Sequence, residues 1–191
     1  MTVKDTMNGQ TEQSSMKNTR GIMVLAKDEL ISALRGEVRL LLHLISKVDA
    51  TKLDYRPTPK QRSMLELLQY LTIMGPIHFH GAIADSWSMA AWGQAWTTGQ
   101  ASAKGRNLDE VKVEIGKHPA MFAELLSSCA DADLRADIEM FGRKASRGSM
   151  IVSLVLSHYA AYRMQVFQYL KGSGQEDLNT LNLWVGMDGA M

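Results

Sequence analysis

The sequence predicts an all-α protein, a four-helix bundle with a long connection between its second and third helices. Apolar side chains recur every three or four residues in several long segments, which is the period of an amphipathic helix. Residues typical of helix ends bound these segments. Between the second and third helices lies a stretch of mixed character, residues 85–106, that is far longer than a tight turn.

Length and composition exclude several classes of function. A chain of 191 residues fits one domain and can bury a sizeable core. Lys and Arg total 21 against 20 Asp and Glu, so no basic field attracts nucleic acid or anionic lipid. No apolar run approaches the roughly 20 residues of a membrane-spanning helix, and the polar N-terminus lacks the pattern of a secretory signal. With a single Cys129 as well, we expect a cytoplasmic protein.

The chain is expected to start with a polar tail and to continue as one domain. Residues 1–18 are rich in Thr, Ser, Asn and Gln and lack apolar periodicity, which predicts a flexible tail. Residues 19–191 then form a single helical domain. Its first helix is predicted over residues 23–48, and His43 within it is interpreted as a structural histidine. The apolar stripe of this helix consists of Leu30, Leu34, Val38, Leu41, Leu42 and Ile45.

The second helix has a clear start signal after a Pro-containing loop at residues 49–62. Ser63 and Glu66 have the spacing of a capping box, in which each side chain bonds the backbone N–H of the other. Pro76 removes the hydrogen bond to the Thr72 carbonyl, so a kink or break is expected there. The following histidines, His78 and His80, are two residues apart and point to different faces of a helix, which favours separate structural or surface roles.

The connection at residues 85–106 is rich in tryptophan. It contains Trp87, Trp92 and Trp96 among small residues, and the last two are four apart, so they stack along one face of a short helix. Two interpretations stay open. The rings plug one end of the core, as buried aromatic side chains usually do, or they cover a pocket as an aromatic lid.

A third helix is predicted from Asn107 to Cys129, with interruptions at Gly116 and Pro119. Residues 130–146 are polar and irregular, with a possible extended piece over residues 138–141. After the fourth helix, Trp184 is expected to pin the C-terminal segment onto the bundle.

The fourth helix, over residues 149–170, carries the most informative pattern of the chain. It stops at the glycines of Gly172-Ser173-Gly174. His158 and Tyr162 lie one turn apart and therefore share a face, within an otherwise apolar stripe. Bundles build binding sites in this way, from side chains that converge between facing helices.

Three segments resemble the DinB/YfiT-like superfamily of bacterial four-helix bundles. They are Leu53-Asp54-Tyr55-Arg56-Pro57, the helix opening from Ser63 to Leu71, and the stretch from His158 to Gln165. The resemblance covers nearly the whole chain after the tail. It implies that the second and third helices run parallel, for which the connection at residues 85–106 is long enough, and it implies a homodimer.

The resemblance also implies a divalent metal held by three histidines, but this sequence departs from that pattern. The three family positions correspond to Tyr70, His158 and Tyr162, so only one imidazole remains. A neutral phenol is a poor ligand because it must first lose a proton with an ordinary pKa near roughly 10. We therefore expect no bound metal and no cofactor. The two tyrosines are expected to hydrogen-bond to each other or to His158, leaving a satisfied polar patch.

Rescue of the metal site by another histidine stays open, with three candidates: His43, His78 and His80. The predicted function is ligand binding or a protein interaction at the remnant cavity. The predicted binding residues are Tyr70, His158, Tyr162, Trp92 and Trp96. One alternative is a metal-dependent enzyme similar to the family's thiol S-transferases, or a hydrolase-like enzyme. The other is a purely structural homodimer.

Overall fold

The computed structural model describes residues 25–189, so the predicted tail at 1–18 lies outside the described residues. The long helices are α2 (Lys27–Ile45), α3 (Met64–Ile83), α4 (Met89–Ala103), α5 (Leu108–Ser128) and α8 (Ser157–Gly172). The shorter elements are η1 (Ala50–Lys52), α6 (Asp131–Arg135), β1 (Asp137–Met140), β2 (Arg143–Ser146), α7 (Arg147–Ile151), η2 (Val152–Leu156) and η3 (Leu181–Val185).

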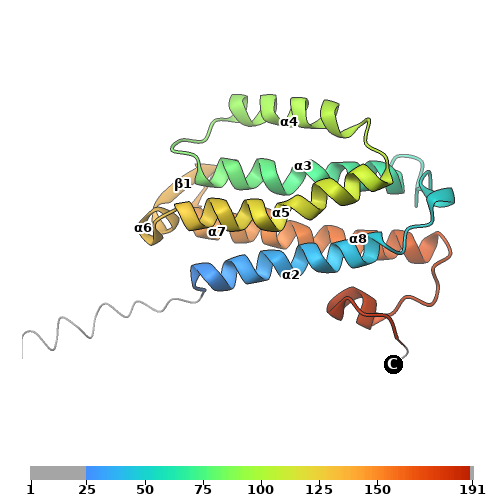
Figure 1. Ribbon diagram of the computed structural model, residues 1–191. Coiled ribbons are helices and arrows are strands. Elements are labelled where there is room, and N and C mark those ends of the chain that lie inside the picture. Colours follow the sequence, from blue (N-terminus) through green and yellow to red (C-terminus); the bar gives the residue numbers. More distant parts are fainter. Residues whose placement is uncertain (1–24, 190–191) are drawn as a thin grey trace, which may run out of the picture.

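Four helical rods surround the core: α2, α3, α5 and the continuous helix formed by α7, η2 and α8 (Figure 1). In Figure 1, α3 and α5 run in the same direction. The fifth long helix, α4, connects them in sequence and runs in the opposite direction along the outer side of α3. The predicted all-α bundle with a long second connection is therefore confirmed, as is the parallel arrangement of its second and third helices. The core is filled by aliphatic side chains from all four rods, among them Leu34, Leu41, Leu68, Leu71, Val111, Ile115, Val155 and Val166.

The predicted start of α3 is confirmed, whereas the predicted break at Pro76 is not. The Ser63 hydroxyl accepts from the Glu66 N–H at 3.2 Å, and a Glu66 carboxylate oxygen accepts from the Ser63 N–H at 2.9 Å. Beyond this capping box the helix is continuous through Pro76. The Thr72 carbonyl, which loses its helical partner at Pro76, accepts instead from Nε2 of the buried His118 at 3.2 Å.

The last long helix contains one wide turn, at η2. There the Ser157 N–H bonds the Val152 carbonyl, five residues back instead of four. After this turn the fully buried positions belong to Tyr159 and Arg163, and their neighbours His158 and Tyr162 are half-buried at the edge of the apolar face. The prediction that His158 and Tyr162 lie within the apolar stripe is thus wrong by one residue. The extra residue of the wide turn rotates the register of the helix that follows.

Residues 130–146 are more regular than expected. Strands β1 and β2 pair antiparallel through a two-residue turn, Phe141-Gly142, and β1 coincides with the predicted extended piece. Both turn residues have a positive φ, 53° at Phe141 and 73° at Gly142. A two-residue hairpin favours this backbone, but a bulky side chain such as Phe141 adopts it only at a cost in free energy.

The C-terminal segment is held by Arg163 rather than by Trp184. Arg163 is 1% exposed, its guanidinium forms a two-point ion pair with Glu37 of α2 at 2.9 and 3.3 Å, and it also donates to the Leu183 carbonyl. Leu183 is buried in the core. Trp184 is 59% exposed and lies beneath the same guanidinium, 4.7 Å from its central carbon, so it covers the ion pair instead of entering the core.

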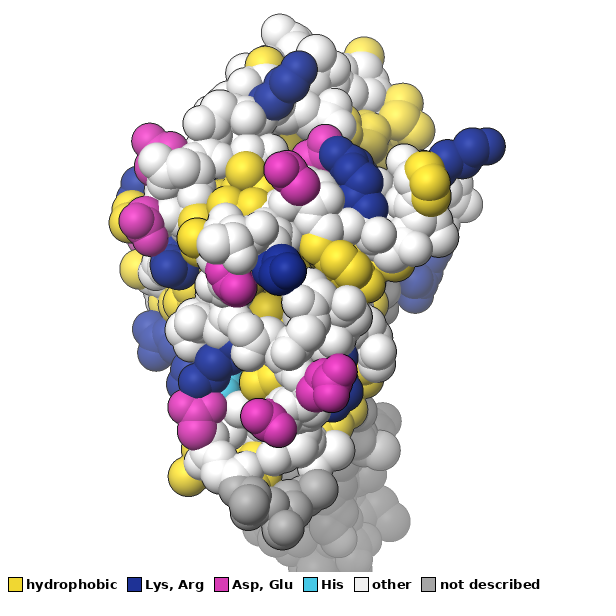
Figure 2. Space-filling model, turned by 90° about the vertical axis from the view of Figure 1, so that its right-hand side faces the viewer, with side chains coloured by type: hydrophobic (Ala, Val, Ile, Leu, Met, Phe, Trp, Pro, Cys, Tyr) yellow, Lys and Arg dark blue, Asp and Glu magenta, His cyan; other side chains and the backbone are white. Residues whose placement is uncertain are grey.

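Within residues 25–189, every helix is too short or too polar to cross a bilayer. Figure 2 shows the end of the bundle at which α3 begins and α8 finishes. Acidic and basic side chains are interspersed over this end, so neither sign of charge dominates it.

Candidate functional site

An aromatic cluster lies between α3, α4, α8 and the β1–β2 turn. We define it by eight side chains: Tyr70, His78, Trp87, Trp92, Trp96, Phe141, His158 and Tyr162. All five residues predicted to bind a ligand belong to it. The structure therefore brings these five together, while their binding role stays a prediction.

The floor of the aromatic cluster is formed by α3 and α8, which run antiparallel (Figure 1). Ring centroids are 4.9 Å apart for Tyr70 and Tyr162, and 5.3 Å apart for His78 and His158. His158 and Tyr162, one turn apart on α8, are separated by 6.2 Å. Tyr70, His158 and Tyr162 thus lie on neighbouring turns of two facing helices.

The cover of the aromatic cluster is α4. Trp92 and Trp96 stack with centroids 5.1 Å apart and planes 19° apart, as their spacing predicts. Trp96 lies 5.5 Å from Tyr70, and Trp92 lies 6.1 Å from His78. Because α4 lies along the outer side of α3 (Figure 1), Trp92 and Trp96 lie beside the bundle, whereas Trp87, which precedes α4, packs against the core. The choice between a plug and a lid stays open.

The tip of the hairpin closes one side of the aromatic cluster. Phe141 lies 4.8 Å from Trp87, 5.1 Å from Trp92 and 6.1 Å from His78, measured between ring centroids. Trp87 in turn rests against Gly81, where an added Cβ would come within 3.4 Å of its ring. These aromatic contacts offset the backbone cost of the positive φ at Phe141.

Two buried indole N–H groups of the aromatic cluster, at Nε1 of Trp87 and of Trp92, have no hydrogen-bond partner among residues 25–189. Nδ1 of His158 is also buried, and the polar group next to this ring is the Leu154 carbonyl, one turn earlier in the helix. Buried polar groups in proteins are nearly always paired with protein, water or ligand. Tyr70 and Tyr162 hydrogen-bond to each other, as expected. The expectation of a satisfied polar patch at Tyr70, Tyr162 and His158 stays a prediction, and the two unpartnered indoles lie beside that patch.

The aromatic cluster is electrically neutral near pH 7. Burial, and then the hydrogen bond with Tyr162, raise the pKa of Tyr70 far above its ordinary value. Burial and the neighbouring His158 lower the pKa of His78 to about 4. Burial also lowers the pKa of His158, and the hydrogen bond with the Leu154 carbonyl opposes that shift.

These residues do not fit the divalent metal of the family pattern. Tyr70 holds its proton more tightly than a free phenol, so it does not supply an anionic oxygen. Among residues 25–189, no group of three or more His, Cys, Asp and Glu side chains is arranged to hold a metal ion. The absence of a bound metal stays a prediction, and the side chains of Tyr70 and Tyr162 support it because neutral phenols are poor metal ligands.

The three candidate rescue histidines lie in different places. His43 contacts Asn182 at 3.3 Å and Asp188 at 3.7 Å, so it serves the C-terminal segment. His80 is exposed on α3. His78 alone joins the aromatic cluster, contrary to the separate role expected for it. Its spacing of eight residues from Tyr70 is the signal for a shared helix face, and the expected break at Pro76 concealed it.

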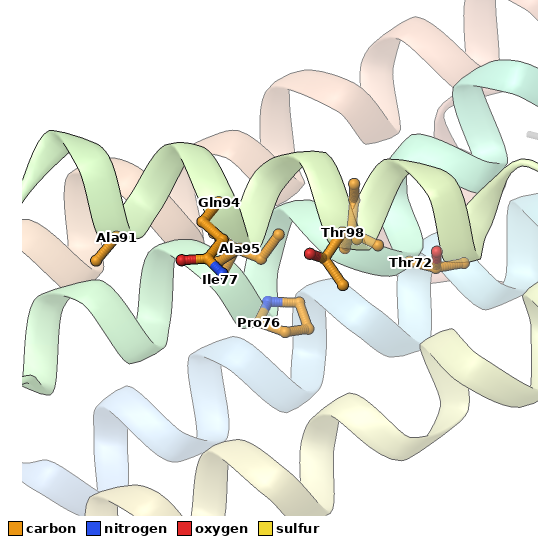
Figure 3. A pocket seen from close by; sticks show the side chains of 9 residues that line it. Thr72, Pro76, Ile77, Ala91, Gln94, Ala95 and Thr98 are labelled. Carbon is orange, nitrogen blue, oxygen red and sulfur yellow. The ribbon is translucent and has the colours of Figure 1, made fainter.

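A separate groove lies on the other flank of α4. It has a volume of about 550 Å³, and Figure 3 shows its lining side chains from α3 and α4. They are Thr72, Ile73, Pro76, Ile77, Ala91, Gln94, Ala95, Thr98 and Gly99. At Gly99 the two helices approach so closely that an added Cβ would lie 3.0 Å from Ile77.

Comparison with family models and with curated proteins gives no significant match. Solved structures do match. A DinB-like protein from Bacillus cereus ATCC 10987 aligns with a TM-score of 0.61 at 14% identity, over 77% of this chain and 92% of its own. A DinB-like protein from Bacillus subtilis aligns with a TM-score of 0.59 at 16% identity, over 78% and 94%.

A mycothiol-dependent maleylpyruvate isomerase also matches, with a TM-score of 0.54 at 12% identity, over 75% of this chain and 60% of the isomerase. At such identities the likeness concerns the fold alone. The chain therefore has the fold of DinB-like proteins, as the three sequence segments predicted.

Proposed function

We propose that this protein binds a small uncharged organic molecule in the aromatic cluster and does so without a metal. The observation that carries the proposal is the pair of buried, unpartnered indole N–H groups at Trp87 and Trp92. Each costs free energy while it is buried and unpaired, on the order of 1–3 kcal/mol. A ligand that supplies partners to these atoms recovers this energy.

Access to the aromatic cluster follows from the weak attachment of α4. The one fully buried side chain of this helix is Ala103, at its C-terminal end. Its main helical neighbour is α3. Because α4 lies outside the four-rod core, we expect it to open at a smaller cost than the bundle and to admit a ligand.

Mass spectrometry of the native protein tests this proposal, together with elemental analysis of the same sample. We expect an organic molecule that is released on denaturation, and no stoichiometric zinc, nickel or iron. The variant Trp92→Ala is expected to lose the molecule while the bundle stays folded. Trp184→Ala is the matched control, because this exposed ring lies under Arg163 and outside the aromatic cluster. Retention of the molecule by Trp92→Ala would contradict the proposal.

A second candidate function is a metal-dependent enzyme, such as a thiol S-transferase or a hydrolase. One observation favours it. His78 and His158 are neighbours, and Nδ1 of His78 bonds the Met74 carbonyl at 2.9 Å, an arrangement common among metal-binding histidines. Near one metal ion per chain, lost in His158→Ala, would establish this candidate in place of the first. A homodimer with a purely structural role predicts neither metal nor organic molecule.

A further inference from the structure

We propose that the ligand of the aromatic cluster is an uncharged aromatic carbonyl compound, of the class of aryl ketones and quinones. Its carbonyl oxygen accepts the hydrogen bond that the Trp92 indole N–H otherwise lacks. This inference rests on the proposed function, since it names the class of molecule for the same site.

The walls of the aromatic cluster favour a flat ring. Trp92 and Trp96 stack on each other with their planes 19° apart, and Phe141 meets Trp92 edge-on at 89°. Tyr70 meets Trp96 at 67°. Faces and edges of this kind attract other aromatic rings through their quadrupoles, beyond the apolar area that is buried. A planar aromatic molecule therefore gains more here than a saturated one of equal size.

The charge of the aromatic cluster excludes ionised ligands from its centre. Its eight members include no carboxylate, ammonium or guanidinium group, and its two histidines are neutral near pH 7. The guanidinium of Arg62 lies 4.2 Å from the Tyr70 ring centroid, but this residue is exposed at the margin. A carboxylate or an amine would lose its hydration without gaining a charged partner among the rings.

The unpartnered atoms specify an acceptor. An indole N–H can only donate a hydrogen bond, so the buried N–H groups of Trp87 and Trp92 each need an acceptor atom. His78 donates through Nδ1 to the Met74 carbonyl, which makes its Nε2 an acceptor, but neither indole N–H is bonded to it. Among uncharged groups attached to aromatic rings, a carbonyl oxygen is a strong acceptor. An aromatic hydrocarbon supplies none.

Equilibrium dialysis of the full chain with three probes tests this inference: 1-indanone, indane and indane-1-carboxylate. They share a bicyclic frame and differ in bearing a neutral carbonyl, no polar group or a charge. We expect 1-indanone to bind about tenfold more tightly than either of the others, the size of effect that one otherwise unmet hydrogen bond gives.

The variant Trp92→Phe keeps an aromatic ring and removes the N–H. We expect it to lower the affinity for 1-indanone about tenfold and to leave that for indane within twofold. Trp184→Phe is the matched control and is expected to change neither affinity. Should Trp92→Phe not fold, infrared difference spectra of the wild-type complex give the same information. The carbonyl stretch of bound 1-indanone is expected at lower frequency than in an apolar solvent.

Equal affinities for 1-indanone and indane, or an unshifted carbonyl stretch, would overturn the assignment of an aromatic carbonyl compound and leave ligand binding at the aromatic cluster intact. Binding of none of the three probes at millimolar concentration would overturn the proposed function itself. The two failures are therefore distinguishable in one set of measurements.

Discussion

The phenol rings of Tyr70 and Tyr162 lie 4.9 Å apart across the contact between α3 and α8 and share a hydrogen bond. His158 is one turn from Tyr162 on the same helix, at a centroid distance of 6.2 Å. The resemblance to the DinB/YfiT-like superfamily expects three imidazoles at these positions. This chain has a pair of neutral phenols at two of them.

The double variant Tyr70→His plus Tyr162→His is expected to create a zinc or nickel site. It supplies three imidazoles on neighbouring turns, and water completes the coordination as in catalytic zinc sites. Because the metal binds only the folded state, it should raise the melting temperature as its concentration rises. Zinc titration monitored by calorimetry is the measurement. The pair Tyr70→Phe plus Tyr162→Phe is the control and should bind no zinc. Equal zinc affinity in the double variant and the parent would contradict the assignment of Tyr70, His158 and Tyr162 to the three ligand positions that the resemblance implies.

Gly75→Ala is expected to destabilise the fold by about 1–3 kcal/mol, the usual cost of overpacking a core. A Cβ at this position would overlap the hydroxyl and ring of Tyr159, which is fully buried. The control is Gly36→Ala in α2, where the added methyl meets open space. There the gain in helix propensity should stabilise the protein by roughly 1 kcal/mol. Urea unfolding of both variants measures the two changes in the free energy of unfolding, which should have opposite signs. A Gly75→Ala protein as stable as the parent would contradict the close contact between Gly75 and Tyr159.

Acidification is expected to destabilise the protein between about pH 6.5 and pH 4. Burial lowers the pKa of His78 and of His118 to about 4 in the folded state, against 6.5 when unfolded. The unfolded chain therefore binds more protons over this interval, and stability falls with falling pH. At pH 5 each histidine should cost on the order of 2 kcal/mol relative to pH 7.

Urea unfolding at pH 7 and pH 5 measures this effect. The variant His78→Leu should reduce the difference between the two pH values, because one of the histidines with a strongly lowered pKa is gone. The exposed His80 provides the control, since His80→Gln should leave the difference unchanged. A His78→Leu protein with the full pH dependence would show that His78 is not the linked group.

We also propose that the protein is a homodimer. The resemblance implies one, and three exposed apolar side chains follow closely on one another near the C-terminus: Trp184, Val185 and Met187. Sedimentation equilibrium at micromolar concentration is expected to give twice the chain mass of 21.2 kDa. A single species of the monomer mass would exclude the dimer.

Local patterns in the sequence determined the helical fold. The stripe from Leu30 to Ile45 and the capping box of Ser63 and Glu66 involve residues within a few turns of one another. Their physics is contained in helix periodicity and in the unpaired N–H groups of a helix start, so it can be read before any tertiary contact is known. The stacking of Trp92 on Trp96 could be predicted for the same reason.

Only the tertiary structure decided which side chains form the aromatic cluster and which hydrogen-bond partners they have. Pro76 does not end α3, because His118, on another helix, serves the Thr72 carbonyl. The unbroken helix brings His78 into the cluster, and the hairpin brings Phe141, 63 residues further along the chain. A wide turn at η2 moves the buried register from His158 to Tyr159. These outcomes depend on contacts between distant segments of the chain. The free energies of those contacts outweigh the local conformational preferences on which a prediction from sequence relies.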